Sequence, residues 1–410
     1  MVPYARQHVS NDDIDAVIKV LRSDFLTQGP VLPQFEQAVA DYCGGTYGVA
    51  VNSATSALHI ACLALDLGPG DWLWTSPNTF VASANCALYC GAKIDFVDID
   101  PDTYNMGVDA LTAKLEKAEK NGRLPKIVMP VHFAGQPCDM PAINALSQRY
   151  GFKIIEDASH AMGASYASED FSDIATATDR EAGPWQANDA IKVGSCTHSD
   201  ITVFSFHPVK IITSGEGGMA LTNSDELANR LRRLRIHGIT SDKGKMLSRP
   251  EDEIWNYQQI ELGFNYRMTE IQAALGLSQL NRLDEYVTQR HEIAKDYDTN
   301  LATLPITIPW QSPNAYSSYH LYPVRVIETE SKKTQHELYE GLRARGIAVN
   351  VHYIPVHRQP YYESLGFAQG DYPEAERLHR EVISLPMYPS LTKAQQQSVT
   401  KVMHESLVSS

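Results

Sequence analysis

The sequence is poor in cysteine and has no long apolar run. Its six cysteines among 410 residues show no spacing typical of a metal site or a disulfide framework. The one close pair, Cys86 and Cys90, is a helical turn apart, which favours small core residues over a pair of ligands. No stretch is long enough for a membrane span, and MVPYARQHVSNDD lacks the apolar core of a signal peptide. We therefore expect a cytoplasmic protein with reduced cysteines, no bound metal and no membrane contact.

Basic residues are outnumbered by acidic ones. The 35 lysines and arginines against 49 aspartates and glutamates give a net charge of −14 at pH 7, which disfavours a nucleic-acid partner. Local basic groups can still bind an anionic small molecule. No G-x-G-x-x-G motif follows a predicted strand, which argues against a nicotinamide-dependent dehydrogenase. The 43% apolar and 20% charged residues indicate an ordinary globular protein with room for two or three domains.

Seven short apolar runs predict the strands of one sheet. They are YGVAVNS, WLWTS, KIDFVDI, KIVMPVHF, KIIEDA, DITVFSF and GMALT, and helical stretches such as SALHIACLALDL separate them. This alternation is typical of a mainly parallel α/β sheet with helices on both faces, which binds ligands at the carboxyl ends of its strands. The pattern changes near residue 250. We therefore divide the chain into a large domain, 1–250, and a region, 251–410, that holds a long connecting helix and a small α+β domain.

Three further segments carry specific predictions. Ser10 and Asp13 stand in capping-box spacing at the start of a helix whose apolar side chains share one face. The stretch MTEIQAALGLSQLNRLDEYVTQRHEIAKDYDTNL is predicted to form one long helix. The acidic segment Ala167–Asp189 shows little periodicity, and we interpret it as a surface insertion or flap.

Polar residues follow two of the predicted strands where the strands end. In VNSATSALH, Ser53 and Thr55 open a helix, a position that suits a phosphate, although Ser53 is equally well explained as a helix cap. In KIIEDASHAMGA, Asp157 ends an apolar strand, and a buried carboxylate requires a partner. That partner is either a protonated heterocyclic nitrogen or the start of a helix. His160 follows one turn later and is the weaker candidate, since a lone histidine is more often structural.

Two more strand ends add a lysine and an aromatic ring. Lys210 follows DITVFSF and precedes TSGEGG, whose glycines allow close backbone approach, and Ser205 adds a hydroxyl for an anion. Phe80 follows WLWTSPNT and is placed to stack on a flat ring, although core packing explains a single phenylalanine as well. A phosphate site, a ring, an acid and an amine are together what pyridoxal 5′-phosphate requires. Its aldehyde binds a lysine, and its pyridinium nitrogen needs a carboxylate.

From about residue 4 to 391 the chain resembles the DegT/DnrJ/EryC1/StrS family of sugar aminotransferases. The motifs that carry the resemblance are NSATSALH, EDASHAMGA, FSFHPVKIITSGEGG and LGFNYRMTEIQAALGLSQL. The resemblance implies a pyridoxal-phosphate-dependent transferase of fold type I that forms a homodimer with shared active sites. SDFLTQGP, SSYHLYPV, VNVHYIPV and ISLPMYPSL are similar to the C4 aminotransferases of pseudaminic acid biosynthesis. That likeness implies UDP-2-acetamido-2,6-dideoxy-β-L-arabino-hexos-4-ulose and glutamate as substrates. The products would be UDP-4-amino-4,6-dideoxy-N-acetyl-β-L-altrosamine and 2-oxoglutarate.

The resemblance also implies roles for individual residues. Lys210 matches the lysine that binds the cofactor aldehyde, Asp157 the partner of the pyridinium nitrogen, and His160 a residue near the phenolic oxygen. The remaining matches are Ala54, Thr55 and Ser205 for the phosphate, Phe80 for ring stacking, and Asn265 for a phosphate contact from the partner subunit. Candidates for the nucleotide half of the substrate are Arg6, Arg267, His320, His352 and Tyr353, each equally well explained as a surface or interface residue.

The resemblance leaves two alternative functions open, and the chain departs from the family pattern in one place. A histidine replaces the lysine in related dehydratases, so Lys210 favours amino transfer. The core motifs suit another UDP- or dTDP-linked ketosugar equally well, and a non-catalytic regulatory protein of the same fold is a third possibility. Asp157 and Lys210 lie further apart in the sequence than the family pattern leads us to expect. The extra length is the acidic segment Ala167–Asp189, which puts substrate contacts near it in doubt.

Overall fold

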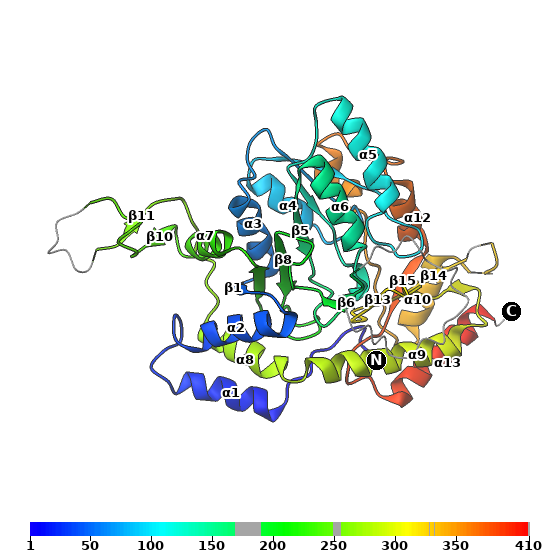
Figure 1. Ribbon diagram of the computed structural model, residues 1–410. Coiled ribbons are helices and arrows are strands. Elements are labelled where there is room, and N and C mark those ends of the chain that lie inside the picture. The colour runs from blue at the N-terminus through cyan, green and yellow to red at the C-terminus, as the bar shows by residue number, and fades with distance from the viewer. Residues whose placement is uncertain (169–189, 249–255, 328, 332, 409–410) are drawn as a thin grey trace.

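The central sheet contains all seven strands that the sequence predicts. The computed structural model describes residues 1–168, 190–248, 256–327, 329–331 and 333–408 (Figure 1). Across the sheet the strands run in the order β1 (Tyr47–Val51), β9 (Gly218–Thr222), β8 (Ile201–Ser205), β5 (Lys153–Asp157), β4 (Ile127–Met129), β2 (Trp72–Thr75) and β3 (Lys93–Phe96). Only β9 runs antiparallel to its neighbours. The prediction of a mainly parallel sheet is confirmed.

Helices cover both faces of this sheet (Figure 1). Consecutive strand residues enter opposite cores: Ile154 packs in one cluster with Phe35 and Trp74, and Ile155 packs in the other with Leu73. Burial on both faces is why the strands read as continuous apolar runs. The covering helices are α2 (Val31–Cys43), α3 (Ala54–Ala64), α4 (Ala82–Tyr89), α5 (Val108–Lys120), α6 (Met140–Tyr150) and α7 (Asp225–Arg235).

The predicted single long helix is wrong, because the segment forms two helices, α8 (Glu270–Leu280) and α9 (Leu283–Leu301). Between them Arg282 has φ −114°, and its N–H bonds to a carbonyl only three residues back. The cause is a buried carboxylate on α1 (Asn11–Leu21), which does begin with the predicted capping box. Asp13 accepts hydrogen bonds from Ser278, Gln279 and Arg282, and these draw the junction toward α1.

A second, smaller sheet forms after residue 300. It consists of β12 (Ile306–Thr307), β14 (Tyr322–Val326) and β15 (Val382–Leu385), all antiparallel. A third apolar cluster joins it to α9, α10 (Gln335–Ala344) and α13 (Lys393–Leu407). The helices α11 (Pro360–Glu363) and α12 (Pro373–Glu381) lie nearer the large sheet, where Tyr362 and Leu378 enter its core. None of the described helices is long and apolar enough to cross a membrane.

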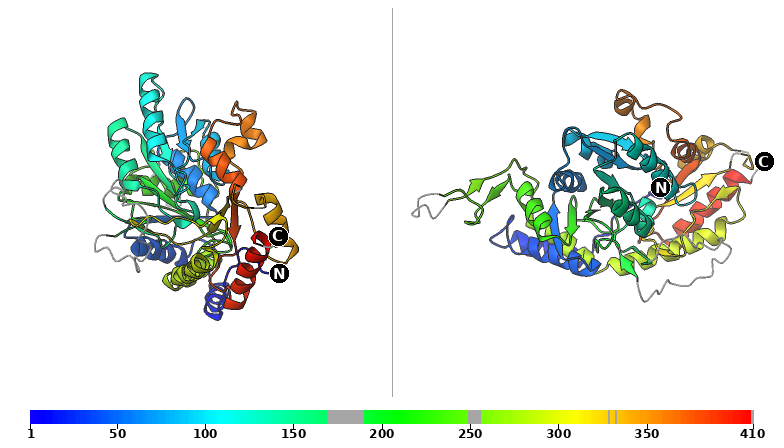
Figure 2. Two further views of the ribbon diagram at one scale, coloured as in Figure 1. Left: turned by 90° about the vertical axis from the view of Figure 1, so that its right-hand side faces the viewer. Right: turned by 45° about the horizontal axis from the view of Figure 1, so that its top comes forward.

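Two short sheets stand apart from these cores. β10 (Ile239–Thr240) and β11 (Gln258–Gln259) form an arm that projects from the body next to α7 (Figures 1 and 2). β6 (Ser165–Tyr166) pairs with β7 (Ile191–Lys192) and β13 (Ala315–Tyr316), so both flanks of the acidic segment meet in one sheet. The segment itself, from residue 169 to 189, lies outside the described residues, and its interpretation as a flap stays a prediction.

Candidate active site

Lys210 and Asp157 lie at the carboxyl ends of two neighbouring parallel strands. Asp157 is the last residue of β5 and pairs with Val203 of β8, and Lys210 follows the end of β8 by five residues. Lys210 is partly exposed, but protein surrounds most of its side chain. Burial lowers the pKa of Lys210 to about 8, and the carboxylate of Asp157 limits that shift. Lys210 can therefore act as a neutral amine under mildly alkaline conditions, whereas an ordinary surface lysine remains protonated.

Two hydrogen bonds orient the carboxylate of Asp157, which is 4% exposed. The Ser83 hydroxyl donates to Oδ2 at 2.6 Å, and the Ser159 N–H donates to Oδ1 at 3.1 Å. Each carboxylate oxygen retains capacity to accept a further hydrogen bond. Ser83 belongs to α4, 74 residues earlier in the chain. The sequence does not reveal Ser83 as a site residue, because no local pattern distinguishes it from a core serine.

A close backbone contact brings the three predicted phosphate residues into one region. The Ser53 hydroxyl caps α3 by accepting the Ser56 N–H at 3.2 Å, so the N–H groups of Ala54 and Thr55 have no partner within the helix. Ser205 pairs with Gly218 across β8 and β9. A Cβ atom on Gly218 would lie 2.5 Å from the backbone nitrogen of Ala54. The start of α3 therefore reaches Ser205 because residue 218 is glycine, and the resulting group of N–H and O–H donors suits a phosphate.

Three predicted histidines gather beside Lys210, and burial keeps them neutral. The rings of His160 and His320 lie 4.4 Å apart between centroids, and His160 Nε2 is 3.1 Å from the hydroxyl of Tyr353. Burial, and then the Lys210 charge, holds the pKa of His160 well below its usual value and lowers the pKa of His352 to about 3. Burial, the neighbouring His160 and Lys210 act on His320 in the same direction. These imidazoles therefore serve as hydrogen-bonding groups and not as cations.

Two buried ring nitrogens in this cluster have no hydrogen-bond partner among the residues that the structure describes. They are Nδ1 of His160 and Nδ1 of His320. A buried polar atom without a partner costs free energy, which a hydrogen bond to a bound molecule recovers. Arg290 fixes the backbone below this cluster by donating to the carbonyl oxygens of Tyr319 and His320 at 3.0 and 3.2 Å. The geometry thus fits a polar ligand beside Lys210.

The other predicted site residues differ in how far they are buried. Arg6 lines a cavity of about 10 Å³ together with Lys210 and Thr213. Arg267 forms a β-bridge to Val51, next to the start of α3, and is half-buried. By contrast, Phe80 is 59% exposed, and Asn265 is also exposed. Within a single chain the structure does not bring these last two side chains into the buried cluster. In the part of the chain that the structure describes, no group of three histidine, cysteine or acidic side chains could hold a metal ion.

Comparisons with known proteins agree on one family. Residues 7–404 match the DegT/DnrJ/EryC1/StrS aminotransferase family. The chain is 35% identical over 393 residues to the UDP-4-amino-4,6-dideoxy-N-acetyl-β-L-altrosamine transaminase of Campylobacter jejuni, covering 95% of this chain and 93% of that protein. The solved structure of Helicobacter pylori PseC, an aminotransferase of pseudaminic acid biosynthesis, covers 100% of both chains at 28% identity with a TM-score of 0.84. The PLP form of the sugar aminotransferase Spr1654 from Streptococcus pneumoniae covers 99% of this chain and 100% of that one, at 28% identity and a TM-score of 0.82.

Proposed function

We propose that this chain, which belongs to the DegT/DnrJ/EryC1/StrS aminotransferase family, transfers the amino group of glutamate to C4 of UDP-2-acetamido-2,6-dideoxy-β-L-arabino-hexos-4-ulose. The products are UDP-4-amino-4,6-dideoxy-N-acetyl-β-L-altrosamine and 2-oxoglutarate. The observation that carries the proposal is the buried, weakly basic amine of Lys210 beside Asp157 at the carboxyl edge of the sheet. The name of the Campylobacter relative supports the choice of sugar.

The residues of the site fit pyridoxal 5′-phosphate. Lys210 would bind its aldehyde, Asp157 its pyridinium nitrogen, and the donors of Ala54, Thr55 and Ser205 its phosphate. His160 offers one unpartnered ring nitrogen to the phenolic oxygen. When bound, the cofactor supplies an electron sink that stabilises negative charge on the reacting carbon.

Lys210 moves the protons of the reaction. As a neutral amine it takes the proton from Cα of glutamate, and in the second half-reaction it returns a proton to C4 of the sugar. The amine starts close to both carbon atoms because the same side chain holds the cofactor, and this proximity supplies much of the rate. The hydrogen bonds from Ser83 and Ser159 orient the Asp157 carboxylate, which would hold the positively charged ring nitrogen.

The nucleotide half of the substrate requires positive charge or N–H donors for its diphosphate. Arg6 and Arg267 supply charge, and Arg6 lies beside Lys210 in the small cavity. The neutral rings of His320 and His352 and the hydroxyl of Tyr353 supply hydrogen bonds only. We assign the two arginines to the diphosphate and the other three residues to the sugar.

We further propose a homodimer whose two active sites are shared between subunits. Asn265 is exposed in the single chain, as expected of a side chain that contributes to the active site of a partner subunit. Three apolar side chains on and next to β11, a few residues before Asn265, are also exposed. They are Tyr257, Ile260 and Leu262. Exposed apolar side chains close together in the chain favour a protein contact.

The proposal is tested by spectroscopy and a substrate panel. We expect the absorbance of the cofactor bound to Lys210 to disappear when glutamate is added, and 2-oxoglutarate to form in equal amount. UDP- and dTDP-linked 4-ketosugars and a 3-ketosugar are then offered to the aminated protein. Amine formation with another sugar alone would replace the proposed substrate. A protein that binds the cofactor but does not react with glutamate would favour the regulatory alternative.

A further inference from the structure

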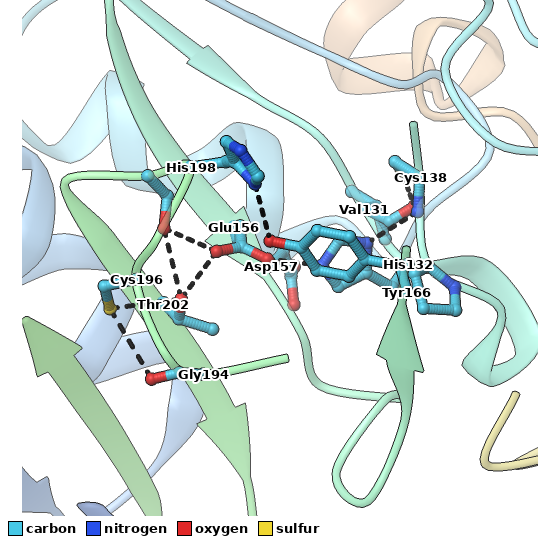
Figure 3. Close-up of polar contacts among 12 residues, drawn as sticks. Val131, His132, Cys138, Glu156, Asp157, Tyr166, Gly194, Cys196, His198 and Thr202 are labelled. Atoms are coloured by element: carbon cyan, nitrogen blue, oxygen red, sulfur yellow. Dashed lines mark hydrogen bonds and ion pairs between the residues drawn. The ribbon is translucent and has the colours of Figure 1, made fainter. Parts of the chain in front are cut away.

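The residue before Asp157 on β5 is a second buried carboxylate, Glu156, which is 1% exposed. Because successive side chains of a strand point to opposite faces, Glu156 lies on the face of the sheet away from Lys210. It accepts three hydrogen bonds, from His132 Nε2 at 2.8 Å, Thr202 Oγ1 at 2.8 Å and Ser199 Oγ at 2.5 Å (Figure 3). The proposed reaction uses none of these groups.

The hydrogen bonds of His132 orient its ring toward Glu156. Its Nδ1 accepts the backbone N–H of Cys138 at 3.0 Å, so Nε2 carries a proton that points to Glu156. Burial by itself lowers the pKa of His132, but its hydrogen bonds with Cys138 and Glu156 outweigh burial and raise that pKa above its usual value. Burial by itself raises the pKa of Glu156, but the hydrogen bonds from His132, Ser199 and Thr202 outweigh burial and hold the pKa below its usual value. A buried anion with three donors has few other arrangements of similar free energy.

The groups that hold Glu156 also hold the backbone of Asp157. The carbonyl of Asp157 accepts the backbone N–H of His132 at 3.1 Å, and its own N–H donates to Pro130 at 2.9 Å. On the other side, Ala158 N–H donates to the carbonyl of Val203, the neighbour of Thr202, at 2.9 Å. The backbone on each side of Asp157 therefore carries a side chain that hydrogen-bonds to Glu156. These side chains are His132 on one side and Thr202 on the other.

The same network reaches both flanks of the acidic segment. The hydroxyl of Tyr166, on β6, lies 3.2 Å from Nδ1 of His198, and Cys196 Sγ lies 3.4 Å from Thr202 Oγ1 (Figure 3). Tyr166 thus contacts the residue next to Ser199, and Cys196 contacts Thr202, so residues before and after that segment lie beside the two hydroxyl donors of Glu156.

We infer that Glu156 is a positioning residue for Asp157: through His132 and Thr202 it fixes the strand end from which Asp157 meets the cofactor's ring nitrogen. The inference rests on the proposed function, since it gives Asp157 a ligand to hold. Without Glu156, the ring of His132 loses its anchor and the carbonyl contact to Asp157 loosens, although both strands remain paired.

The test compares the pyridoxal-phosphate affinity of the wild-type chain with that of three variants. We expect Glu156→Ala to weaken cofactor binding roughly ten-fold. Glu156→Gln should restore most of the affinity, because its amide oxygen still accepts from His132 and its NH2 group can donate to the Ser199 and Thr202 hydroxyls. The matched control is Glu376→Ala, which breaks a second buried pair, His357–Glu376 at 2.9 Å, in which His357 packs against the rings of Phe96 and Tyr372. It should lower the unfolding temperature and leave cofactor affinity unchanged.

A double-mutant cycle with Asp157→Asn separates positioning from general loosening. If Glu156 acts through Asp157, Glu156→Ala should change cofactor affinity less than about two-fold in the Asp157→Asn background. An undiminished ten-fold effect there, or no effect in the wild-type background, would overturn the inference. If Glu156→Ala does not fold, His132→Phe serves in the same cycle, because Glu156 then keeps its two hydroxyl donors. Normal cofactor affinity of Asp157→Asn alone would instead refute the assignment of Asp157, and with it the proposed site.

Discussion

Replacement of Gly218 by alanine should separate cofactor phosphate binding from the rest of the site. The added Cβ would lie 2.5 Å from the nitrogen of Ala54, 2.6 Å from its Cα atom and 2.6 Å from the carbonyl carbon of Ser53. All three are backbone atoms of a helix start, so none can rotate away. Ordinary contacts of this kind begin near 3.4 Å, so β9 and α3 must separate by roughly an ångström. Such overpacking typically costs about 1–3 kcal/mol of stability.

The separation also moves the N–H groups of Ala54 and Thr55 away from Ser205. A hydrogen bond to a charged group contributes about 1.5–3 kcal/mol, so loss of one phosphate contact should weaken binding about 10- to 100-fold. Because the change affects only the phosphate, pyridoxal without its phosphate should bind Gly218→Ala as it binds the wild type. Titration of both compounds, followed by absorbance, gives the two affinities.

The control for this experiment is Gly68→Ala. A Cβ atom at Gly68 would meet nothing within 4 Å, and we expect cofactor affinity to remain unchanged. Equal losses for pyridoxal and its phosphate in Gly218→Ala would show that the whole site had collapsed. Unchanged phosphate affinity would show that α3 and Ser205 do not hold the phosphate, and the proposed cofactor geometry would be wrong.

Four further predictions concern Lys210 and the dimer. Lys210→Ala should keep the wild-type circular dichroism spectrum but produce no 2-oxoglutarate from glutamate, and product formation at the wild-type rate would exclude Lys210 as the base. In the cofactor-free chain, acylation of Lys210 by an amine-selective reagent, followed by peptide mass spectrometry, should rise with a midpoint near pH 8, where burial places its pKa; a midpoint above pH 10 would contradict that burial. The same depressed pKa should make the free energy of unfolding rise with pH between about 8 and 10.5, because the unfolded chain binds the extra proton there. Mixing inactive Lys210→Ala and Asn265→Ala subunits should restore about a quarter of wild-type activity at random assembly, since one site of each mixed dimer is then intact; no recovery despite subunit exchange would refute the shared site.

The strands, and the place of Lys210 and Asp157 at the carboxyl edge of the sheet, could be predicted because their signals are local. Burial on both faces makes a central strand a continuous apolar run, and a lysine or aspartate directly after such a run lies at the carboxyl edge of the sheet. The glycines after Lys210 were predicted to allow close backbone approach. Gly218 does so against Ala54, while Gly215 adopts φ +82°. These features need only neighbouring residues to be recognised.

The partners of the site residues could not be predicted, because they are distant in the sequence. Ser83 lies 74 residues from Asp157, and His132 lies 24 residues from Glu156. The break between α8 and α9 has the same origin. The sequence around Arg282 is compatible with a continuous helix, and Asp13, 269 residues away, ends it. The periodicity of apolar residues indicates which face of a helix or strand a residue lies on. It does not indicate which distant polar group forms a hydrogen bond with that residue.

The charges of the buried site explain why its histidines and its lysine have different tasks. Lys210 and Asp157 are close enough that the carboxylate raises the pKa of the amine, yet burial still holds that pKa at about 8. Burial, and then the charge of Lys210, lowers the pKa of His160 and of His352, so both imidazoles are neutral near pH 7. Lys210 is therefore a much stronger base than the imidazoles beside it. That order of basicity suits the proposed reaction, in which the amine of Lys210, and not a histidine, takes up a proton from one carbon atom and delivers a proton to the next.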